Sequence, residues 1–384
     1  MIEIMNNSVT NALKPKISVI GIGGSGCNSV DRMVDSNLEN INFISINTDY
    51  QALNDCHATQ KIQIGKKLTS GLGAGSDPTI GESSAEEDSE EISSAVSDSK
   101  MVILTCGLGG GTGTGAIPVV ARICKDLKIL TVAVVTLPFS FEGTPRMELA
   151  QKGLDLLKDN VDMLLVIPND KLLEMNEKSF YLDDAFVIAD DALKNTIEGM
   201  TGIIFGTGTI NVDFNDIKAT LENKGLGHLG IGTVKNDDPI LDAVKQAINS
   251  PLLETDISSA TNILINTSGR INLKELNEAM SYIHQITDPS VKIIWGTVSN
   301  KVQNEEIVVT IIATGLSEGR KQEVTTDVGD LKSTLLRSTG LKNHVSAPAS
   351  PARGIIDPIR TDTDGFPLQI PEFLQHYSRI RKSN

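Results

Sequence analysis

The sequence predicts an α/β protein built on a parallel sheet, and three observations support this fold class. Between residues 16 and 168, near-continuous apolar runs alternate with segments of helical apolar spacing. Such runs are typical of strands that helices cover on both faces, as in parallel sheets. Glycine-rich loops at 21–26 and 107–115 each join an apolar strand to the start of a helix. The length of 384 residues and the hydrophobic content of 40% allow about two domains.

The first strand and glycine loop lie within "ISVIGIGGSGCNSVDRMV", from Ile17 to Val34. Residues 21–26 satisfy the pattern G-x-G-x-x-G, and Asp49 lies roughly where the ribose-binding acid of a dinucleotide-binding fold stands. Taken alone, this loop favours NAD and makes a Rossmann oxidoreductase an open alternative. That alternative leaves the second glycine loop unexplained.

The second glycine loop, "CGLGGGTGTGA" from Cys106 to Ala116, lies between an apolar strand at 100–106 and a helix at 116–127. Backbone N–H groups of a glycine-rich turn at a helix N-terminus form a cradle for anions. No lysine follows the glycines, so the P-loop pattern G-x-x-x-x-G-K-[ST] is absent. A purely structural turn seldom needs five glycines, so the two loops together predict a mononucleotide with a chain of phosphates.

Three further apolar strands, INFISIN, ILTVAVV and DMLLVIP, belong to the first predicted domain, 16–181. The acidic segment 82–99 is expected to be helical with a solvated face and no chemical role.

A helix at 182–204 is apolar around most of its circumference, which predicts a buried, central helix between two domains. Asp190 and Asp191 interrupt its apolar surface and need a functional reason.

A second, smaller α/β domain is predicted at 205–316, because strand and helix patterns alternate again after Gly225. Its expected elements are GIGTV, PILDAVKQAINS, NILINTS, NLKELNEAMSYIHQI, VKIIWGTVS and EIVVTIIATG. Residues 1–15 are expected to be a flexible N-terminus and 317–365 a disordered linker. The segment 366–384 is apolar with a basic end, and we expect a docking peptide there or, alternatively, a helix that packs on the body.

Composition narrows the classes of function. The net charge is −15, and no block rich in Lys and Arg is present, so no nucleic-acid partner is expected. The four cysteines have no C-x-x-C spacing and are expected to be buried free thiols. No secretory signal pattern and no apolar run of membrane-spanning length is present. We therefore expect a cytoplasmic protein without direct membrane insertion.

Four motifs in order resemble the FtsZ family of bacterial division GTPases, the prokaryotic relatives of tubulin. They are "GGGTGTG" at 109–115, "LPFSFEG" at 137–143, "IPNDKLL" at 167–173 and "NVDFND" at 211–216. The likeness runs from about Lys16 to Gly315. It implies a tubulin-like GTPase domain with a parallel sheet, a central helix, a second domain, and head-to-tail polymerisation coupled to GTP hydrolysis in a division ring.

The resemblance also implies which residues surround GTP or GDP. The residues that match its phosphate loops are Gly24, Ser25, Gly26, Cys27, Gly111, Thr112 and Gly113. The residues that match the loop sensing the γ-phosphate are Gly71, Ala74 and Gly75. Those that match the ribose and phosphate side are Glu142, Arg146 and, nearby, Asn169. The alternative for Glu142 and Arg146 is a surface ion pair, which would contribute little.

On the base side, Asn28 would approach the purine and Phe186 would stack on it. Asp191 would accept hydrogen bonds from guanine N1–H and the exocyclic amine, which adenine cannot supply in that arrangement. Core packing is the alternative for Phe186. The sequence departs from the family pattern at Ser25 and Cys27, where relatives often have glycine, and at Asp190, where Asn is common.

Hydrolysis of GTP needs an oriented water and Mg²⁺ on the phosphates. Asp213 and Asp216 lie three residues apart, so both project from one face of a helix's first turn. Capping of that helix by Asp213 is the structural alternative. The resemblance implies instead that this loop, with Asn211, enters the next subunit's nucleotide pocket. A filament that binds nucleotide without hydrolysing it is the remaining alternative.

The segment "QIPEFLQHY" resembles the family's docking peptide, although it lacks the usual flanking acid and following arginine. The resemblance implies that membrane-adaptor and division-regulator proteins bind residues 366–376 and that the protein acts at the division site.

Overall fold

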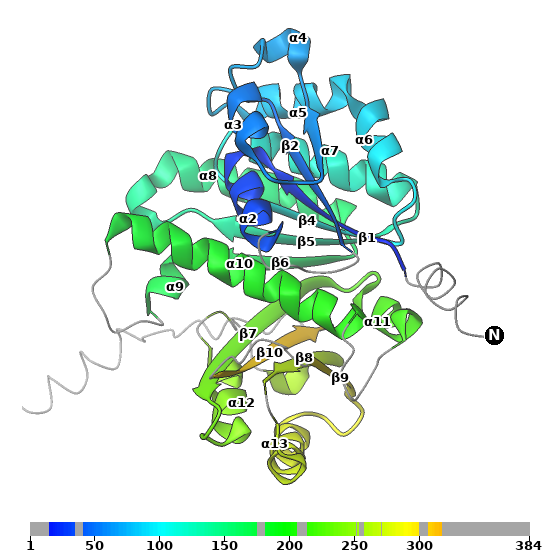
Figure 1. The fold of residues 1–384 in the computed structure, drawn as a ribbon, viewed down its shortest axis with the longest axis vertical. Helices are drawn as coiled ribbons and strands as arrows, with labels where there is room; N and C mark the ends of the chain where they lie inside the picture. The colour runs from blue at the N-terminus through cyan, green and yellow to red at the C-terminus, as the bar shows by residue number, and fades with distance from the viewer. Residues whose placement is uncertain are drawn as a thin grey trace, which may run out of the picture. The chain divides into compact units, whose positions relative to one another are not determined.

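The computed structural model describes residues 15–34, 41–174, 181–205, 213–250, 252, 257–269, 271–298 and 306–316. These residues form an α/β fold with a ten-stranded sheet in the order β3-β2-β1-β4-β5-β6-β7-β10-β8-β9 (Figure 1). The predicted fold class is thereby confirmed. Four predictions lie outside the described residues: those for the N-terminal segment 1–14, Asn211, the linker 317–365 and the docking peptide 366–384.

Six strands pair in parallel. They are β1 (Ile17–Ile22), β2 (Ile41–Asn47), β3 (Gln60–Gln63), β4 (Met101–Gly107), β5 (Leu130–Leu137) and β6 (Met163–Pro168). The helices that connect or follow them are α2 (Gly23–Val34), α3 (Tyr50–Asp55), α4 (Lys66–Thr69), α5 (Pro78–Glu87), α6 (Ser89–Val96), α7 (Thr112–Asp126), α8 (Thr144–Leu157) and α9 (Asn169–Glu174), with the 3₁₀ turns η1 (Ser140–Glu142) and η2 (Lys158–Asn160). In this arrangement the carboxyl ends of the strands gather along one edge, where ligands of α/β folds bind.

Helices cover both faces of the parallel sheet. Met101 and Ile103 of β4 pack in one core with α2 and α10 (Leu182–Phe205). Val102 and Leu104 point the other way and pack with α5, α6 and α7. Because successive residues of a strand face opposite sides, both cores use the same strands. This explains why the strands read as near-continuous apolar runs.

The strand β7 (Gly225–Lys235) joins the parallel sheet to a second, smaller sheet. Gly225 to Gly227 pair in parallel with β6, whereas His228 to Lys235 pair antiparallel with β10 (Glu306–Thr314). The strand β8 (Asn262–Ser268) lies between β10 and β9 (Lys292–Val298). The remaining elements are α11 (Phe214–Leu221), α12 (Ile240–Ile248), η3 (Ile257–Ser259) and α13 (Leu273–Ile286). Residues of α12 and α13 form a core with one face of this smaller sheet.

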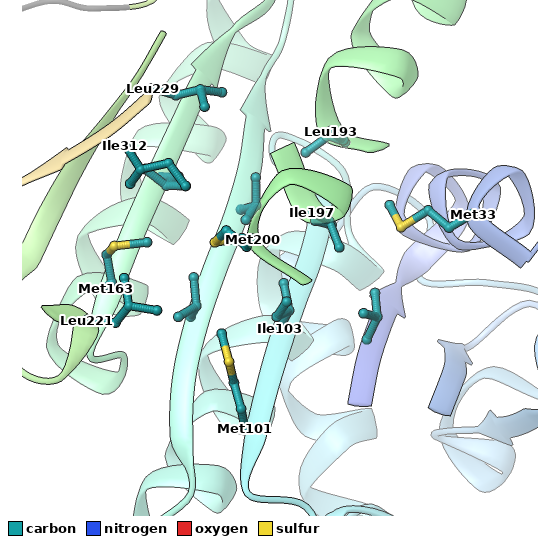
Figure 2. Close-up of a cluster of buried hydrophobic side chains, with 14 of the residues drawn as sticks. Met33, Met101, Ile103, Met163, Leu193, Ile197, Met200, Leu221, Leu229 and Ile312 are labelled. Atoms are coloured by element: carbon teal, nitrogen blue, oxygen red, sulfur yellow. The ribbon is translucent and has the colours of Figure 1, made fainter. Parts of the chain in front are cut away.

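The helix α10 packs against both sheets. Its residues Leu193, Ile197 and Met200 are buried in a single cluster with residues of both sheets (Figure 2). The labelled partners from the strands are Met101, Ile103, Met163, Leu229 and Ile312. One continuous apolar core therefore joins the two halves of the described structure.

Three elements differ from the sequence-based expectation. The strand β3, QKIQ, was not predicted because its polar residues lack an apolar pattern. The strand β7 begins five residues before the expected GIGTV, in a glycine-containing stretch that weakens the strand signal. The acidic segment 82–99 forms parts of two helices, α5 and α6, which meet at Asp88.

Candidate functional site

Three loops meet at the carboxyl edge of the parallel sheet. Gly23 begins α2 with a φ of 73°, and a Cβ at this position would lie 2.8 Å from the backbone nitrogen of Gly113. A Cβ on Gly111 would lie 2.9 Å from the Cβ of Ala74. Glycine is needed at Gly23 both for the left-handed backbone and for the close approach. The loops at 23–27 and 71–75 therefore both pack directly on the loop at 107–113.

A cavity of about 160 Å³ lies beside these loops. The predicted residues that line it are Ser25, Asn28, Glu142, Arg146, Asn169 and Phe186. The lining residues that were not assigned to the site individually are Gly107 and Leu108 of the second glycine loop, Thr136, Pro138, Ala189 and Asp190. Most of the second group lie at the ends of β4 and β5. Their position in the sheet brings them to the cavity, and their residue types gave no chemical signal in the sequence.

Glu142 is fixed at the cavity wall by two contacts. Its Oε2 lies 3.0 Å from Nη1 of Arg146, and its Oε1 accepts a 2.8 Å hydrogen bond from the Phe139 N–H. Only 9% of the Glu142 side chain is exposed, whereas 51% of Arg146 is exposed. The pair is thus not a fully solvated surface ion pair. The Arg146 guanidinium has five N–H donors, so it retains donors for an anion in the cavity.

Asn169 brings a buried polar atom to the cavity. It begins α9 directly after β6 and is 5% exposed. Its Oδ1 has no hydrogen-bond partner among the described residues. A buried acceptor left without a partner costs about 1–3 kcal/mol. Its position therefore favours a ligand that donates a hydrogen bond to this oxygen.

Three phenylalanine rings lie together next to the cavity. Phe139 and Phe141 are stacked with centroids 5.0 Å apart, and Phe186 meets Phe139 edge-on at 5.4 Å. Phe141 is 57% exposed and Phe186 is 42% exposed. Core packing alone does not account for rings that remain this exposed. Their aromatic surface is suited to contact with a planar base.

The two adjacent acids of α10 have different environments. The Asp190 side chain lines the cavity and is 14% exposed, whereas that of Asp191 is 54% exposed and lies outside the cavity lining. Asp190 accepts a 2.9 Å hydrogen bond from the Ser29 hydroxyl, and its Oδ2 lies 3.3 Å from Nε of Arg32. Asp191 lies 3.9 Å from Nη1 of the same arginine. The structure therefore presents Asp190, and not Asp191, to the cavity.

The remaining predicted loop residues have two kinds of surroundings. A Cβ on Gly24 or Gly75 would meet nothing within 4 Å, so both face open space. Gly26 and Cys27 are buried, and a hydrogen bond with the Cys56 thiol, together with burial, raises the pKa of the Cys27 thiol. These two residues can offer a ligand backbone N–H groups but no charge.

Two further residues tie the loops to their neighbours. The hydroxyls of Thr112 and Thr48 are hydrogen-bonded at 2.6 Å, which joins the second glycine loop to the end of β2. Gly71 has a φ of 79°, and its carbonyl accepts a 3.0 Å hydrogen bond from the Tyr50 N–H. The loop at 71–75 is thereby attached to the start of α3.

Asp213 and Asp216 lie on the opposite edge of the sheet from the cavity. Asp213 caps α11 by accepting a 3.2 Å hydrogen bond from the Asn215 N–H, so the capping interaction is present. Asp216 lies 3.4 Å from Nζ of Lys292, and both acids are exposed. The segment after α11 is attached to the residue before β6, since the Lys224 N–H donates to the Asp162 carbonyl at 2.8 Å. The structure therefore does not bring these acids to the cavity of their own chain.

Asp49 and the four cysteines do not line the cavity. The Asp49 carboxylate caps α3 by accepting a 3.0 Å hydrogen bond from the Ala52 N–H. All four cysteines are buried and free. In the part of the chain that the structure describes, no three His, Cys, Asp or Glu side chains are grouped so that they could hold a metal ion.

Comparisons with known proteins agree with this geometry. Residues 16–177 match the GTPase domain of the tubulin/FtsZ family, and residues 225–317 match the C-terminal domain of the FtsZ family. The chain is similar to an empty FtsZ dimer from M. jannaschii, at 45% identity over 80% of this chain and 90% of that chain, with a TM-score of 0.77. A mutant of FtsZ from the same organism matches at 45% identity over 80% of this chain and 93% of that chain, also with a TM-score of 0.77.

A more distant likeness shows the fold alone. The GDP-bound monomer of CetZ1 from Haloferax volcanii matches at 23% identity over 84% of this chain and 99% of that chain, with a TM-score of 0.68. The glycine loops and most of the residues that line the cavity lie within the matched GTPase domain, 16–177, and Phe186, Ala189 and Asp190 of α10 complete the lining. The chain belongs to the tubulin/FtsZ family.

Proposed function

We propose that this GTPase assembles head to tail into the filaments of a cell-division ring and hydrolyses GTP between neighbouring subunits. The observation that carries the proposal is the separation of the cavity from Asp213 and Asp216, which lie at opposite edges of one sheet. A GTPase of this family whose acids cannot reach its own nucleotide needs a second copy to supply them. The NAD-binding alternative does not account for the family matches, and a scaffold without hydrolysis gives Asp213 and Asp216 no chemical role.

The cavity fits a guanosine nucleotide. The three glycine-containing loops offer backbone N–H groups and open space at Gly24 and Gly75 for the phosphates. The unpartnered Asn169 oxygen suits a ribose hydroxyl or base donor. Because Asp190 lines the cavity, we propose it as the acceptor for guanine N1–H and the exocyclic amine, the role that the sequence analysis assigned to Asp191.

Mg²⁺ is compatible with this set of residues. The ion keeps several waters and is commonly held by substrate phosphates with few protein ligands, so a protein cage is not required. When bound, it neutralises charge on the phosphates during transfer. The residues of this chain then bind and orient the nucleotide, and Asp213, Asp216 and Asn211 of a neighbouring copy orient the attacking water.

The dimensions of α10 support catalysis by a neighbour. Phe186 and Asp190 lie near its start, and α11 follows its end (Figure 1). The helix has 24 residues, which at the rise of an α-helix is a length of about 36 Å. Asp213 follows that end, so it cannot contact a nucleotide bound in the cavity. Stacking of copies would instead bring the acid-bearing edge of one to the cavity of the next.

An apolar surface lies at the loop 71–75. Tyr50, Leu68 and Leu72 are 60%, 56% and 85% exposed, and the Tyr50 N–H bonds to the loop at Gly71. Neighbouring exposed apolar side chains are typical of interaction surfaces. We propose that this surface contacts the next subunit in the filament.

The test is assembly and phosphate release by the purified chain with GTP, with ATP as the control nucleotide. Light scattering is expected to rise with GTP and to fall as phosphate is released, and ATP is expected to give neither signal. Phosphate release at an unchanged rate per molecule below the concentration needed for assembly would contradict hydrolysis between subunits.

A mixing experiment tests the shared site directly. Asp216→Ala is expected to lower phosphate release about 100-fold, as the loss of a water-orienting group does. Asp242→Ala removes an acid on α12 whose side chain is 55% exposed, against 60% for Asp216, and is the matched control. A mixture of Asp216→Ala with the cavity variant Asp190→Ala should release more phosphate than the sum of the two alone, because some contacts then join an intact cavity to an intact Asp216. A mixture without this gain would argue against the shared site.

We also propose that the protein works in the cytoplasm at the division site and that adaptor proteins bind residues 366–376. The described part of the chain has no helix long and apolar enough to cross a membrane. Removal of residues 366–384 is expected to abolish adaptor binding in a pull-down assay and to leave GTP-dependent assembly unchanged.

A further inference from the structure

Ser29 is a fully buried residue of α2 that contacts the proposed base-reading acid. Its Oγ lies 2.9 Å from Oδ1 of Asp190 and 3.0 Å from the carbonyl oxygen of Ser25. A hydroxyl has one proton and donates it to one acceptor at a time. An ionised carboxylate is the stronger acceptor of the two. The hydroxyl therefore donates to Asp190 whenever that acid is charged.

The second oxygen of Asp190 is also held from α2, since it lies 3.3 Å from Nε of Arg32. Each oxygen of the Asp190 carboxylate thus has one partner, and the two partners together fix the orientation of the carboxylate plane. Each carboxylate oxygen can accept two hydrogen bonds, so one acceptor site remains on each oxygen. Guanine N1–H and the exocyclic amine are two parallel donors that match two such sites.

We propose that Ser29 is a positioning residue for guanine recognition: its hydroxyl holds the Asp190 carboxylate in the orientation that accepts both guanine donors. The proposal rests on the proposed function, which makes Asp190 the base-reading acid. If the base-reading acid had no hydrogen-bond partners, its side chain would become ordered only when the nucleotide binds. Here Ser29 and Arg32 order it beforehand, which lowers the entropy cost of binding.

The charges around Asp190 support this role. Burial raises the pKa of the Asp190 carboxyl, the Ser29 hydrogen bond and the Arg32 guanidinium oppose that rise, and the neighbouring Asp191 adds to it. Loss of the Ser29 hydroxyl removes one of the two opposing interactions, so the pKa of Asp190 rises further. At a given pH, more of the acid is then neutral. A neutral carboxyl carries a proton on one oxygen and cannot accept from both guanine donors.

The experiment measures binding of GDP and of inosine diphosphate, which lacks the exocyclic amine, to the full chain by titration calorimetry. Ser29→Ala is expected to weaken GDP binding about tenfold, the usual effect of losing a hydrogen bond to a charged group. Inosine diphosphate should lose less, so the preference for GDP shrinks. As the pH is lowered towards the raised pKa of Asp190, GDP affinity should start to fall at a higher pH in the variant than in the unmodified chain.

Ser18→Ala is the matched control. Ser18 is also fully buried and hydroxyl-bonded, at 2.8 Å to Ser99, but it does not line the cavity. This control should keep the preference for GDP and the pH profile of the unmodified chain. Ser29→Cys retains a weak donor and should show an intermediate preference. If Ser29→Ala does not fold, the preference of Ser29→Cys for GDP tests the role of Ser29.

The outcomes separate this inference from the proposed function. An unchanged preference for GDP and an unchanged pH profile in Ser29→Ala and Ser29→Cys would overturn the role of Ser29 while leaving guanine binding intact. Failure of the unmodified chain to bind GDP would overturn the proposed function itself.

Discussion

At the scale of single residues, two adjacent acids show where sequence patterns stop being informative. Asp190 and Asp191 are chemically identical, and the family resemblance assigned the base-reading role to Asp191. Consecutive residues of an α-helix point about 100° apart, so only one of them can face the cavity. The rotation of α10 is set by its apolar contacts with two sheets, which depend on residues far apart in the sequence. The structure therefore separates the two acids where the sequence cannot.

This separation gives a matched pair of variants. Asp190→Ala is expected to weaken GDP binding about 100-fold, because two hydrogen bonds to a charged group are lost. Asp191→Ala should change GDP affinity by no more than about twofold, since an exposed ion pair contributes little. Titration of each variant with GDP measures the difference. A larger loss in Asp191→Ala than in Asp190→Ala would restore the assignment made from the sequence.

At the scale of elements, glycine spacing and apolar runs were sufficient to predict both glycine loops between a strand and a helix, and most strands. These signals are local, because a strand buried on both faces needs apolar residues throughout. The strand β7 was harder to predict in full, because its first three residues pair with β6 and the rest with β10. Such pairing between distant segments has no local pattern. The same reason explains why Thr136 and Pro138 were missed as cavity residues.

The contact between α5 and α7 depends on a glycine that the sequence analysis did not single out. A Cβ on Gly115 would collide with the carbonyl oxygen of Pro78, and it would lie 2.7 Å from the backbone nitrogen of Glu82. Backbone atoms cannot rotate away as a side chain can. Gly115→Ala is therefore expected to lower the free energy of unfolding by about 2 kcal/mol through overpacking.

Thermal unfolding of the nucleotide-free protein measures this effect. Gly110→Ala is the control, because a Cβ there would meet nothing within 4 Å. The control should unfold within about 0.5 kcal/mol of the unmodified chain. Equal stability of both variants would show that α5 can move away from α7 at little cost.

At the scale of the whole molecule, the two halves of the described structure share one core. The helix α10 contributes Leu193, Ile197 and Met200 to a cluster that includes Ile103 of the parallel sheet and Ile312 of the smaller sheet. The strand β7 is hydrogen-bonded into both sheets. Unfolding of either half would expose the apolar surface of the other. The described structure should therefore unfold as one cooperative unit, although its sequence suggests two domains.

The only tryptophan of the chain allows this cooperativity to be measured. Trp295 lies on β9 in the smaller sheet and donates a 3.1 Å hydrogen bond to the Thr267 hydroxyl. Its fluorescence reports on that sheet, whereas far-UV circular dichroism is dominated by the helices around the parallel sheet.

Ile197 is fully buried on α10, and Ile197→Ala is expected to lower the free energy of unfolding by about 2–5 kcal/mol. Both probes should shift together in the variant, because coincident transitions are the mark of two-state unfolding.

Leu156→Ala on α8, where the side chain is 60% exposed, is the matched control and should leave both transitions nearly unchanged. If the Trp295 signal moved alone in Ile197→Ala, the smaller sheet would be an independent unit resting on α10. A common shift would mean that both sheets and α10 unfold as one cooperative unit.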